Sequence, residues 1–81
     1  MTDTQLTVYS TTWCPDCHRA KAFLSSKKVD FQEVDIEAKP EAAGVVAAHN
    51  DGKHVVPTIE IDGQFFGNPS LKELGELLTR N

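Results

Sequence analysis

The residues best suited to chemistry are two cysteines, Cys14 and Cys17, which stand in the segment Trp13-Cys14-Pro15-Asp16-Cys17. They are the only 2 cysteines among 81 residues. As a structural crosslink the pair would be weak, because closing a loop of about four residues removes only ~2 kcal/mol of unfolded-state entropy, against ~3 for about 15 residues. Two thiols at this spacing can instead exchange with other thiols and disulfides. The pair is therefore a candidate dithiol redox centre.

The two thiols are expected to play different roles. Pro15 suits the first position of a helix, and this placement makes Cys14 the N-cap residue. Its side chain would accept hydrogen bonds from the backbone N–H groups of Asp16 and Cys17. These donors and the positive end of the helix dipole favour a thiolate, so we expect Cys14 to be the nucleophile. Cys17 lies one turn further into the helix, where it is less exposed and can attack a mixed disulfide formed on Cys14.

The neighbours of the cysteines act on this chemistry in different ways. The carboxylate of Asp16 disfavours a second negative charge, and His18, Arg19 and Lys21 could partly offset it. The alternative for His18 and Arg19 is an ordinary solvated helix face. Trp13 is either a core residue or an exposed wall against which substrate stacks, and we favour the exposed wall.

Two rival chemistries use the same residue types. The segment Cys14-Pro15-Asp16-Cys17-His18 also spells the C-x-x-C-H pattern of covalent haem attachment, but the 1 methionine is Met1, which leaves no obvious methionine for the second axial position. A zinc site could combine the cysteines with His49 and His54. However, the interval between these pairs is far longer than the about 12 to 15 residues of zinc fingers. We therefore expect no metal, with His49 at a helix end and His54 in a loop.

Hydrophobic periodicity predicts seven elements that must position the cysteines, in the order β, α, β, α, β, β, α. The four predicted strands are Gln5 to Tyr9, Val29 to Ile36, Thr58 to Ile61 and Gln64 to Phe66. The three predicted helices run from Pro15 to about Lys28, from Pro40 to His49, and over Leu71 to Leu78. Because alternation is imperfect in the second strand, we expect it to be buried on both faces.

Local signals mark the connections between these elements. Pro57 can precede the third strand without breaking a hydrogen-bonded ladder. Asp62-Gly63 predicts a two-residue hairpin, and Ser70 with Glu73 predicts a capping box before the last helix. Parallel pairing through the first crossover and antiparallel pairing through the hairpin predict a mixed sheet with helices on its faces.

Composition limits the function classes. A chain of 81 residues predicts a single domain over 1–81. The formal net charge of -4 provides no electrostatic attraction for nucleic acid or for an anionic membrane. No run approaches 18 apolar residues, and the N-terminal residues are polar, so we expect a soluble, cytoplasmic protein. We also expect a monomer.

At this point the chain resembles the thioredoxin superfamily and, within it, the short glutaredoxins. The resemblance rests on Val8 to Cys17, on Val56-Pro57-Thr58 and on Asp62-Gly63, and it covers nearly all of the chain. It implies a thioredoxin fold, with a four-stranded mixed sheet flanked by helices, and a thiol-disulfide oxidoreductase. It further implies that Pro57 is cis and faces the active-site cysteine, and that Val56 pairs through its backbone with a bound thiol or peptide.

The resemblance also bears on the co-substrate. Glutathione-dependent glutaredoxins usually carry a lysine shortly before the first cysteine and a Gly-Gly-acidic element before the last helix, whereas this chain has Thr11-Thr12 and Gly67-Asn68-Pro69-Ser70. The Asn-Pro-Ser element is more similar to the mycoredoxins, which use mycothiol. The expected co-substrate is therefore mycothiol or bacillithiol rather than glutathione, and the expected substrates are protein mixed disulfides. The expected substrate contacts are Trp13, Pro15, Val56, Pro57, Asn68 and Ser70.

Two alternatives stay open. The segment Asn68-Pro69-Ser70 could simply initiate the last helix. The protein could instead be a thioredoxin-like electron donor, for example to ribonucleotide reductase, that is reduced by a flavoprotein reductase. The tryptophan-containing motif of such redoxins is not seen at Gly67 to Ser70.

Overall fold

The computed structural model describes residues 6–78, and its elements follow the predicted order. The strands are β1 (Leu6–Ser10), β2 (Gln32–Asp35), β3 (Thr58–Ile61) and β4 (Gln64–Gly67). The helices are α1 (Pro15–Ser26), α2 (Pro40–Ala48) and α3 (Leu71–Leu78). The predicted borders differ from these mainly at the second strand, which is shorter than expected, and the predicted first residue of β1, Gln5, lies outside the described residues.

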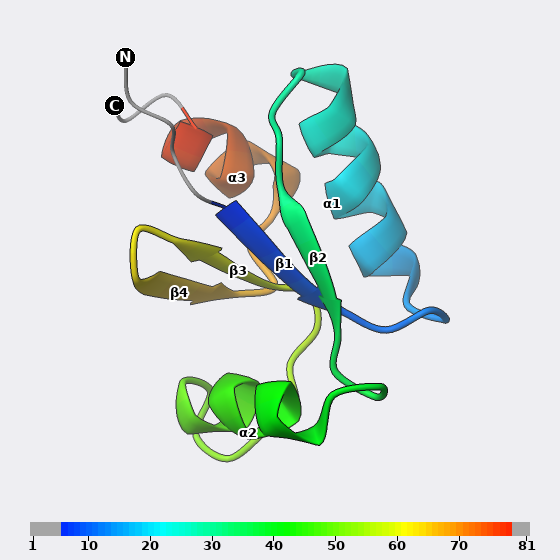
Figure 1. Cartoon of the computed structure of the whole chain (residues 1–81). Coiled ribbons are helices and arrows are strands. Elements are labelled where there is room, and N and C mark those ends of the chain that lie inside the picture. The colour runs from blue at the N-terminus through cyan, green and yellow to red at the C-terminus, as the bar shows by residue number, and fades with distance from the viewer. Residues whose placement is uncertain (1–5, 79–81) are drawn as a thin grey trace.

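The four strands form one mixed sheet in the order β2-β1-β3-β4 (Figure 1). Strand β1 pairs in parallel with β2 and antiparallel with β3, and β3 pairs antiparallel with β4. The β3-β4 turn contains Asp62 and Gly63, with φ angles of 51° and 84°. Two positive φ angles are the requirement of a type I′ turn, whose twist matches that of the flanking strands. The predicted hairpin and the mixed sheet are confirmed.

Helices cover both faces of the sheet. In Figure 1, α1 and α3 lie on one face and α2 on the other. The cluster beneath α1 and α3 contains Leu6, Val8, Ala20, Leu24, Ile59 and Leu74. The smaller cluster beneath α2 contains Ile36, Ala42 and Val46. Side chains alternate along a strand, so β1 contributes Val8 to the first cluster while Tyr9 packs against the second.

The expectation that the second strand is buried on both faces is wrong. Strand β2 lies at the sheet edge, with Gln32 and Glu33 exposed and Val34 and Asp35 half-buried. Its position follows from pairing with β1 on one side, a contact between segments far apart in the sequence. The hydrophobic pattern of a strand does not show whether it lies in the middle or at the edge of a sheet, because the order in which strands pair decides that.

The last helix begins as predicted. The Ser70 N–H donates to Oε1 of Glu73 at 2.9 Å, and the Glu73 N–H donates to the Ser70 hydroxyl at 3.1 Å. This reciprocal pair is a capping box, which satisfies two N–H groups at the helix start. Within residues 6–78, no helix combines the length and the apolar character needed to cross a membrane.

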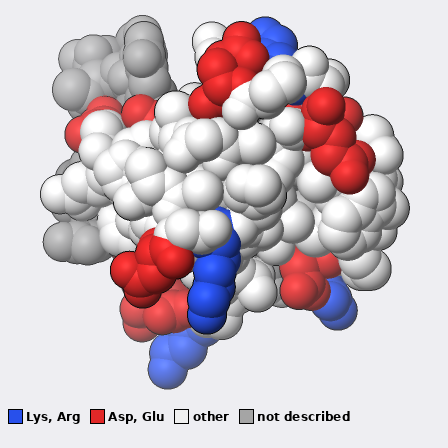
Figure 2. Space-filling model, turned by 90° about the horizontal axis from the view of Figure 1, so that it is seen from below, with Lys and Arg blue, Asp and Glu red and all other residues white. Residues whose placement is uncertain are grey.

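Charged side chains are dispersed on the face that carries α2. Seen from below, the Lys and Arg side chains lie among acidic ones, and a broad uncharged area covers much of this face (Figure 2). No basic patch of the described residues gathers on this face.

Candidate active site

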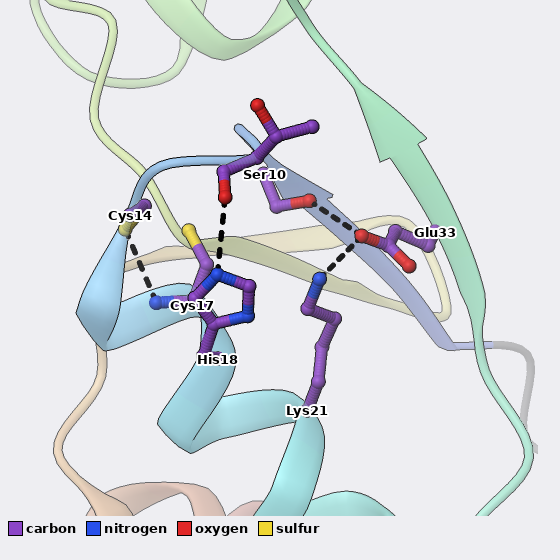
Figure 3. Close-up of polar contacts among 7 residues, drawn as sticks. Ser10, Cys14, Cys17, His18, Lys21 and Glu33 are labelled. Carbon is purple, nitrogen blue, oxygen red and sulfur yellow. Dashed lines mark hydrogen bonds and ion pairs between the residues drawn. The ribbon is translucent and has the colours of Figure 1, made fainter.

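Cys14 occupies the predicted N-cap of α1. Its backbone is extended, with φ −86° and ψ 113°, and Pro15 takes the first helical position. The Cys14 sulfur accepts the backbone N–H of Cys17 at 3.1 Å (Figure 3). The second expected donor, the N–H of Asp16, does not bond to the sulfur, so this part of the prediction is wrong. One aligned N–H at the third helical position is sufficient for an N-cap.

Cys17 is the more buried of the two thiols. Both thiols are buried, but Cys14 keeps 5% of its surface exposed whereas Cys17 has none exposed. Burial and the hydrogen bond with Cys14 raise the pKa of Cys17 from 9.0 to about 12, although the Thr11 backbone and the Lys21 ammonium act to lower it. At neutral pH Cys17 is therefore a thiol rather than a thiolate.

The segment before β3 lies against Cys14. The Val56-Pro57 peptide bond is cis, as the resemblance implies, and Pro57 is buried. The Cys14 thiol donates to the Val56 carbonyl oxygen across 3.8 Å. The Asn68 N–H donates to the carbonyl oxygen of Pro57 at 2.7 Å. The fold thus gathers Cys14, Val56, Pro57 and Asn68 from three separate parts of the chain.

Asn50 holds this segment in place, and the sequence analysis did not predict this role. Its side-chain amide donates to the Val46 carbonyl at 2.7 Å and to the Thr58 hydroxyl at 3.3 Å. The Thr58 hydroxyl in turn donates to the Val55 carbonyl at 2.7 Å. No sequence signal identifies this contact, because the position is typical of a helix terminus.

Trp13 forms one wall of a cleft beside the cysteines. It is 65% exposed, in agreement with the favoured expectation, and its indole N–H donates to Oε2 of Glu37 at 3.1 Å. The cleft has a volume of about 570 Å³. It is lined by Thr11, Trp13, Ile36, Glu37, Pro40, Ala43, Gly44, His54 and Val56. Glu37 was not predicted as a site residue, since its partner Trp13 is 24 residues away.

A second hollow, of about 340 Å³, adjoins the start of α3. It is lined by Asp16, Arg19, Ala20, Asn68, Pro69, Ser70, Leu71 and Glu73. Asn68 has a left-handed backbone, with φ 43°, and Ser70 is engaged in the capping box described above. The alternative interpretation of this segment, initiation of the last helix, is therefore realised in the structure.

The charged neighbours of the cysteines are mostly paired with other groups. Arg19 forms an ion pair with Asp16, and both side chains are exposed. The His18 ring lies 3.1 Å from the Thr12 carbonyl oxygen. Lys21 instead pairs with Glu33. Of the three residues expected to offset Asp16, Arg19 therefore does so by direct contact.

The histidines of the zinc alternative lie in ordinary surroundings. His49 stacks on the Phe65 ring with centroids 3.8 Å apart, and His54 lines the Trp13 cleft. Within residues 6–78, no three side chains of His, Cys, Asp or Glu are grouped as metal ligands would be.

Comparison with known proteins gives consistent results. A family model described as Glutaredoxin matches residues 6–66. A protein of Mycobacterium tuberculosis named as a glutaredoxin is 40% identical over 76 residues, which are 93% of this chain and 90% of that protein. Mycoredoxin 1 of Corynebacterium glutamicum is 34% identical over 70 residues, 85% of this chain and 86% of that protein.

A solved structure supports the architecture. The glutaredoxin of Archaeoglobus fulgidus superposes with a TM-score of 0.80, over 94% of this chain and 87% of that chain. At 23% sequence identity this likeness concerns the fold alone. The predicted thioredoxin fold is confirmed.

Proposed function

The chain belongs to the glutaredoxin family of thiol-disulfide oxidoreductases, and we propose that it uses Cys14 to reduce mixed disulfides between proteins and a sugar-containing low-molecular-weight thiol. The observation that carries this proposal is the surroundings of the Cys14 sulfur. It accepts the Cys17 N–H at the helix start and lies beside the carbonyl of Val56, a residue that lines the Trp13 cleft. A thiolate formed on this sulfur can attack an incoming disulfide.

The proposed reaction has two exchange steps. The Cys14 thiolate attacks the small-thiol sulfur of the mixed disulfide, so that the old S–S bond breaks and the protein leaves as a thiolate that takes up a proton. A second small thiol then attacks the new disulfide on Cys14, releasing the small-thiol disulfide and restoring the Cys14 thiolate. The second small thiol is the reductant, and its proton balances the one taken up by the protein thiolate; a flavoprotein reductase would reduce the small-thiol disulfide again. Cys17 serves as the resolving thiol when the dithiol route is used.

Backbone and aromatic contacts are proposed to hold the substrate. We assign Val56 to backbone pairing with the bound thiol, next to the cis Pro57. Pro15, exposed at the start of α1, is proposed as a further contact of the same thiol. The exposed Trp13 ring provides a flat apolar surface for the remainder of the small thiol. These roles are supported by the short path from the Cys14 sulfur to Val56 and from Val56 to the cleft.

The charge of the cleft favours mycothiol over glutathione. Glu37 is the carboxylate of the lining, and the lining residues include no lysine or arginine. Glutathione carries a carboxylate at each end, whereas mycothiol is uncharged and rich in hydroxyl groups. An aromatic face beside a carboxylate can stack on a sugar ring and accept its hydroxyl hydrogens. We therefore rank mycothiol first and bacillithiol, another glucosamine-containing thiol, second.

The second hollow is proposed to receive the far end of the small thiol or the protein substrate. Asn68 provides a side-chain amide there, next to the Asp16-Arg19 ion pair. Ser70 keeps a hydroxyl proton to donate, because its oxygen acts as an acceptor in the capping box. Since the reaction requires reduced cysteines, which the cytoplasm maintains, we propose that the protein acts in the cytoplasm. We also propose that it acts as a monomer.

Intact-mass spectrometry tests the proposal. The Cys17→Ser variant is exposed in parallel to the disulfides of mycothiol, bacillithiol and glutathione, with Cys14→Ser as the matched control. We expect a single adduct on Cys17→Ser, formed fastest with mycothiol, and none on Cys14→Ser.

Two results would contradict the proposal. Equal adduct formation on both variants would remove the assigned roles of the two cysteines. Absence of any adduct, together with direct reduction of the wild type by a thioredoxin reductase, would make the protein a thioredoxin-like electron donor instead.

A further inference from the structure

Lys21 lies on the same face of α1 as Cys17, one turn further along the helix. Residues four apart in a helix are neighbours on its surface. Figure 3 shows the Lys21 ammonium and the Cys17 sulfur both directed from α1 toward the end of β1. The Lys21 side chain is only 19% exposed, although lysine usually reaches into solvent. The ammonium group is thus kept near the buried thiol.

Two residues from neighbouring strands hold this ammonium in place. The Glu33 carboxylate, on β2, lies 2.5 Å from Lys21 Nζ. The same oxygen, Oε2, accepts the hydroxyl of Ser10 at 3.2 Å (Figure 3). Ser10 ends β1 and is 1% exposed, so the far side of the pair is anchored in the sheet. A lysine tethered in this way loses the freedom to swing away from α1.

A positive charge near Cys17 would favour the resolving reaction. Cys17 is fully buried, and a thiol must lose its proton before it can attack a disulfide. Burial opposes that loss, whereas a nearby ammonium favours the negatively charged product. Among the groups that shift the pKa of Cys17, Lys21 is the one cation, and it lowers the value.

We propose that Lys21 is a positioning residue for the resolving step, in which its tethered ammonium stabilises the Cys17 thiolate. The inference rests on the proposed function, because it assigns a purpose to Cys17 in the dithiol route. In this step the Cys17 S–H bond breaks and a Cys17–Cys14 disulfide forms. The bond between Cys14 and the small thiol breaks, and the small thiol leaves with the electron pair and takes up the proton released by Cys17.

The other groups around the pair do not supply this charge. On α1, Cys14 raises the pKa of Cys17. The flanking titratable residues have other partners: Asp16 pairs with Arg19, and the His18 ring contacts the Thr12 carbonyl oxygen. Strand β2 contributes Glu33, which is near Asp35, and both are acidic. Strand β1 and its continuation contribute the Ser10 hydroxyl and the Thr11 backbone, which are neutral.

The test follows the resolving step with an artificial disulfide. Ellman's reagent first places thionitrobenzoate on Cys14 and releases one equivalent, and attack by Cys17 then releases a second, so stopped-flow absorbance separates the two steps. For Lys21→Met we expect the second release to be slower near pH 7, by up to about tenfold, because a rise of one unit in the pKa of Cys17 lowers its thiolate fraction tenfold. The first release should be unchanged, and the pH at which the second rate levels off should move upward.

Matched variants separate charge from packing. Lys21→Arg keeps the charge and should restore the rate, whereas Lys21→Gln, which is neutral and polar, should behave like Lys21→Met even if the latter folds poorly. Lys27→Met removes a charge from the end of the same helix, about 15 Å from Cys17 at 1.5 Å per residue, and should leave both rates unchanged.

The inference is wrong if Lys21→Met leaves the second rate and its pH profile unchanged, or if Lys21→Arg is as slow as Lys21→Met. No biological thiol enters this assay. Its failure is therefore separate from failure of the proposed function, which would appear as missing adducts with the natural disulfides.

Discussion

Replacing Glu37 with glutamine should change which small thiol the protein prefers, without altering the cysteines. The Glu37 carboxylate is held in the Trp13 cleft by the indole N–H at 3.1 Å. Glutamine keeps an oxygen that can accept this hydrogen bond, so the wall of the cleft should stay in place. The change therefore removes a negative charge and little else.

The size of the effect follows from the charge that glutathione brings into the cleft. Two carboxylates about 8 Å apart repel by about 0.5 kcal/mol at an effective dielectric of about 80, and by about 1 kcal/mol at about 40. Removing one of them should raise kcat/KM for a glutathione mixed disulfide by about two- to fivefold, since 1.4 kcal/mol corresponds to a factor of about ten. For a mycothiol mixed disulfide, which is uncharged, kcat/KM should stay level or fall slightly as the carboxylate acceptor is lost.

The assay compares kcat/KM for the same peptide carrying either thiol as a mixed disulfide. Glu41→Gln is the matched control, because Glu41 is also acidic and exposed, in the first turn of α2, but does not line the cleft. We expect the glutathione-to-mycothiol ratio to rise in Glu37→Gln and to stay near the wild-type value in Glu41→Gln. The selectivity should also weaken with added salt, which screens exposed charges.

An unchanged ratio in Glu37→Gln would refute this reasoning about the cleft. Equal increases in both variants would show that net charge, rather than the Glu37 position, governs selectivity.

Two further predictions concern stability. In Gly67→Ala the new Cβ would collide with Oδ1 of Asn50, so the Asn50 side chain must shift and its hydrogen bonds should weaken, at a cost of about 1 to 3 kcal/mol. Gly44→Ala, whose new Cβ would meet no atom beyond its own helix within 4 Å, should stabilise by about 0.5 to 1 kcal/mol; thermal unfolding that ranked the variants in the reverse order would contradict this. Lys21 lowers the pKa of Glu33 below 4.5, so the ion pair stabilises the fold above pH 4.5 and loses that contribution as pH falls through the folded pKa. In Glu33→Gln the free energy of unfolding, measured with urea, should therefore fall less on acidification, by less than about 1 kcal/mol because both side chains are partly exposed. An unchanged fall would exclude the ion pair as its source.

Features that depend on a few neighbouring residues were predicted from the sequence alone. Pro15 at the start of a helix placed Cys14 at the N-cap, and the structure has the same arrangement. The Asp62-Gly63 turn and the capping box of Ser70 were also predicted correctly. Each of these signals is local, because backbone sterics and hydrogen bonds within one turn decide it.

The amino-acid sequence by itself thus determined the element order, the paired thiols and their unequal exposure, through hydrophobic period and local capping. Only the tertiary structure decided that β2 is an edge strand, that Glu37 faces Trp13, and that Lys21 is tethered by Glu33 beside Cys17. These contacts join residues that are 12 or more positions apart. The physical reason is that such pairs form only when the packed sheet and helices bring their elements together, and nothing in the pattern of either segment alone reports which partner it will meet.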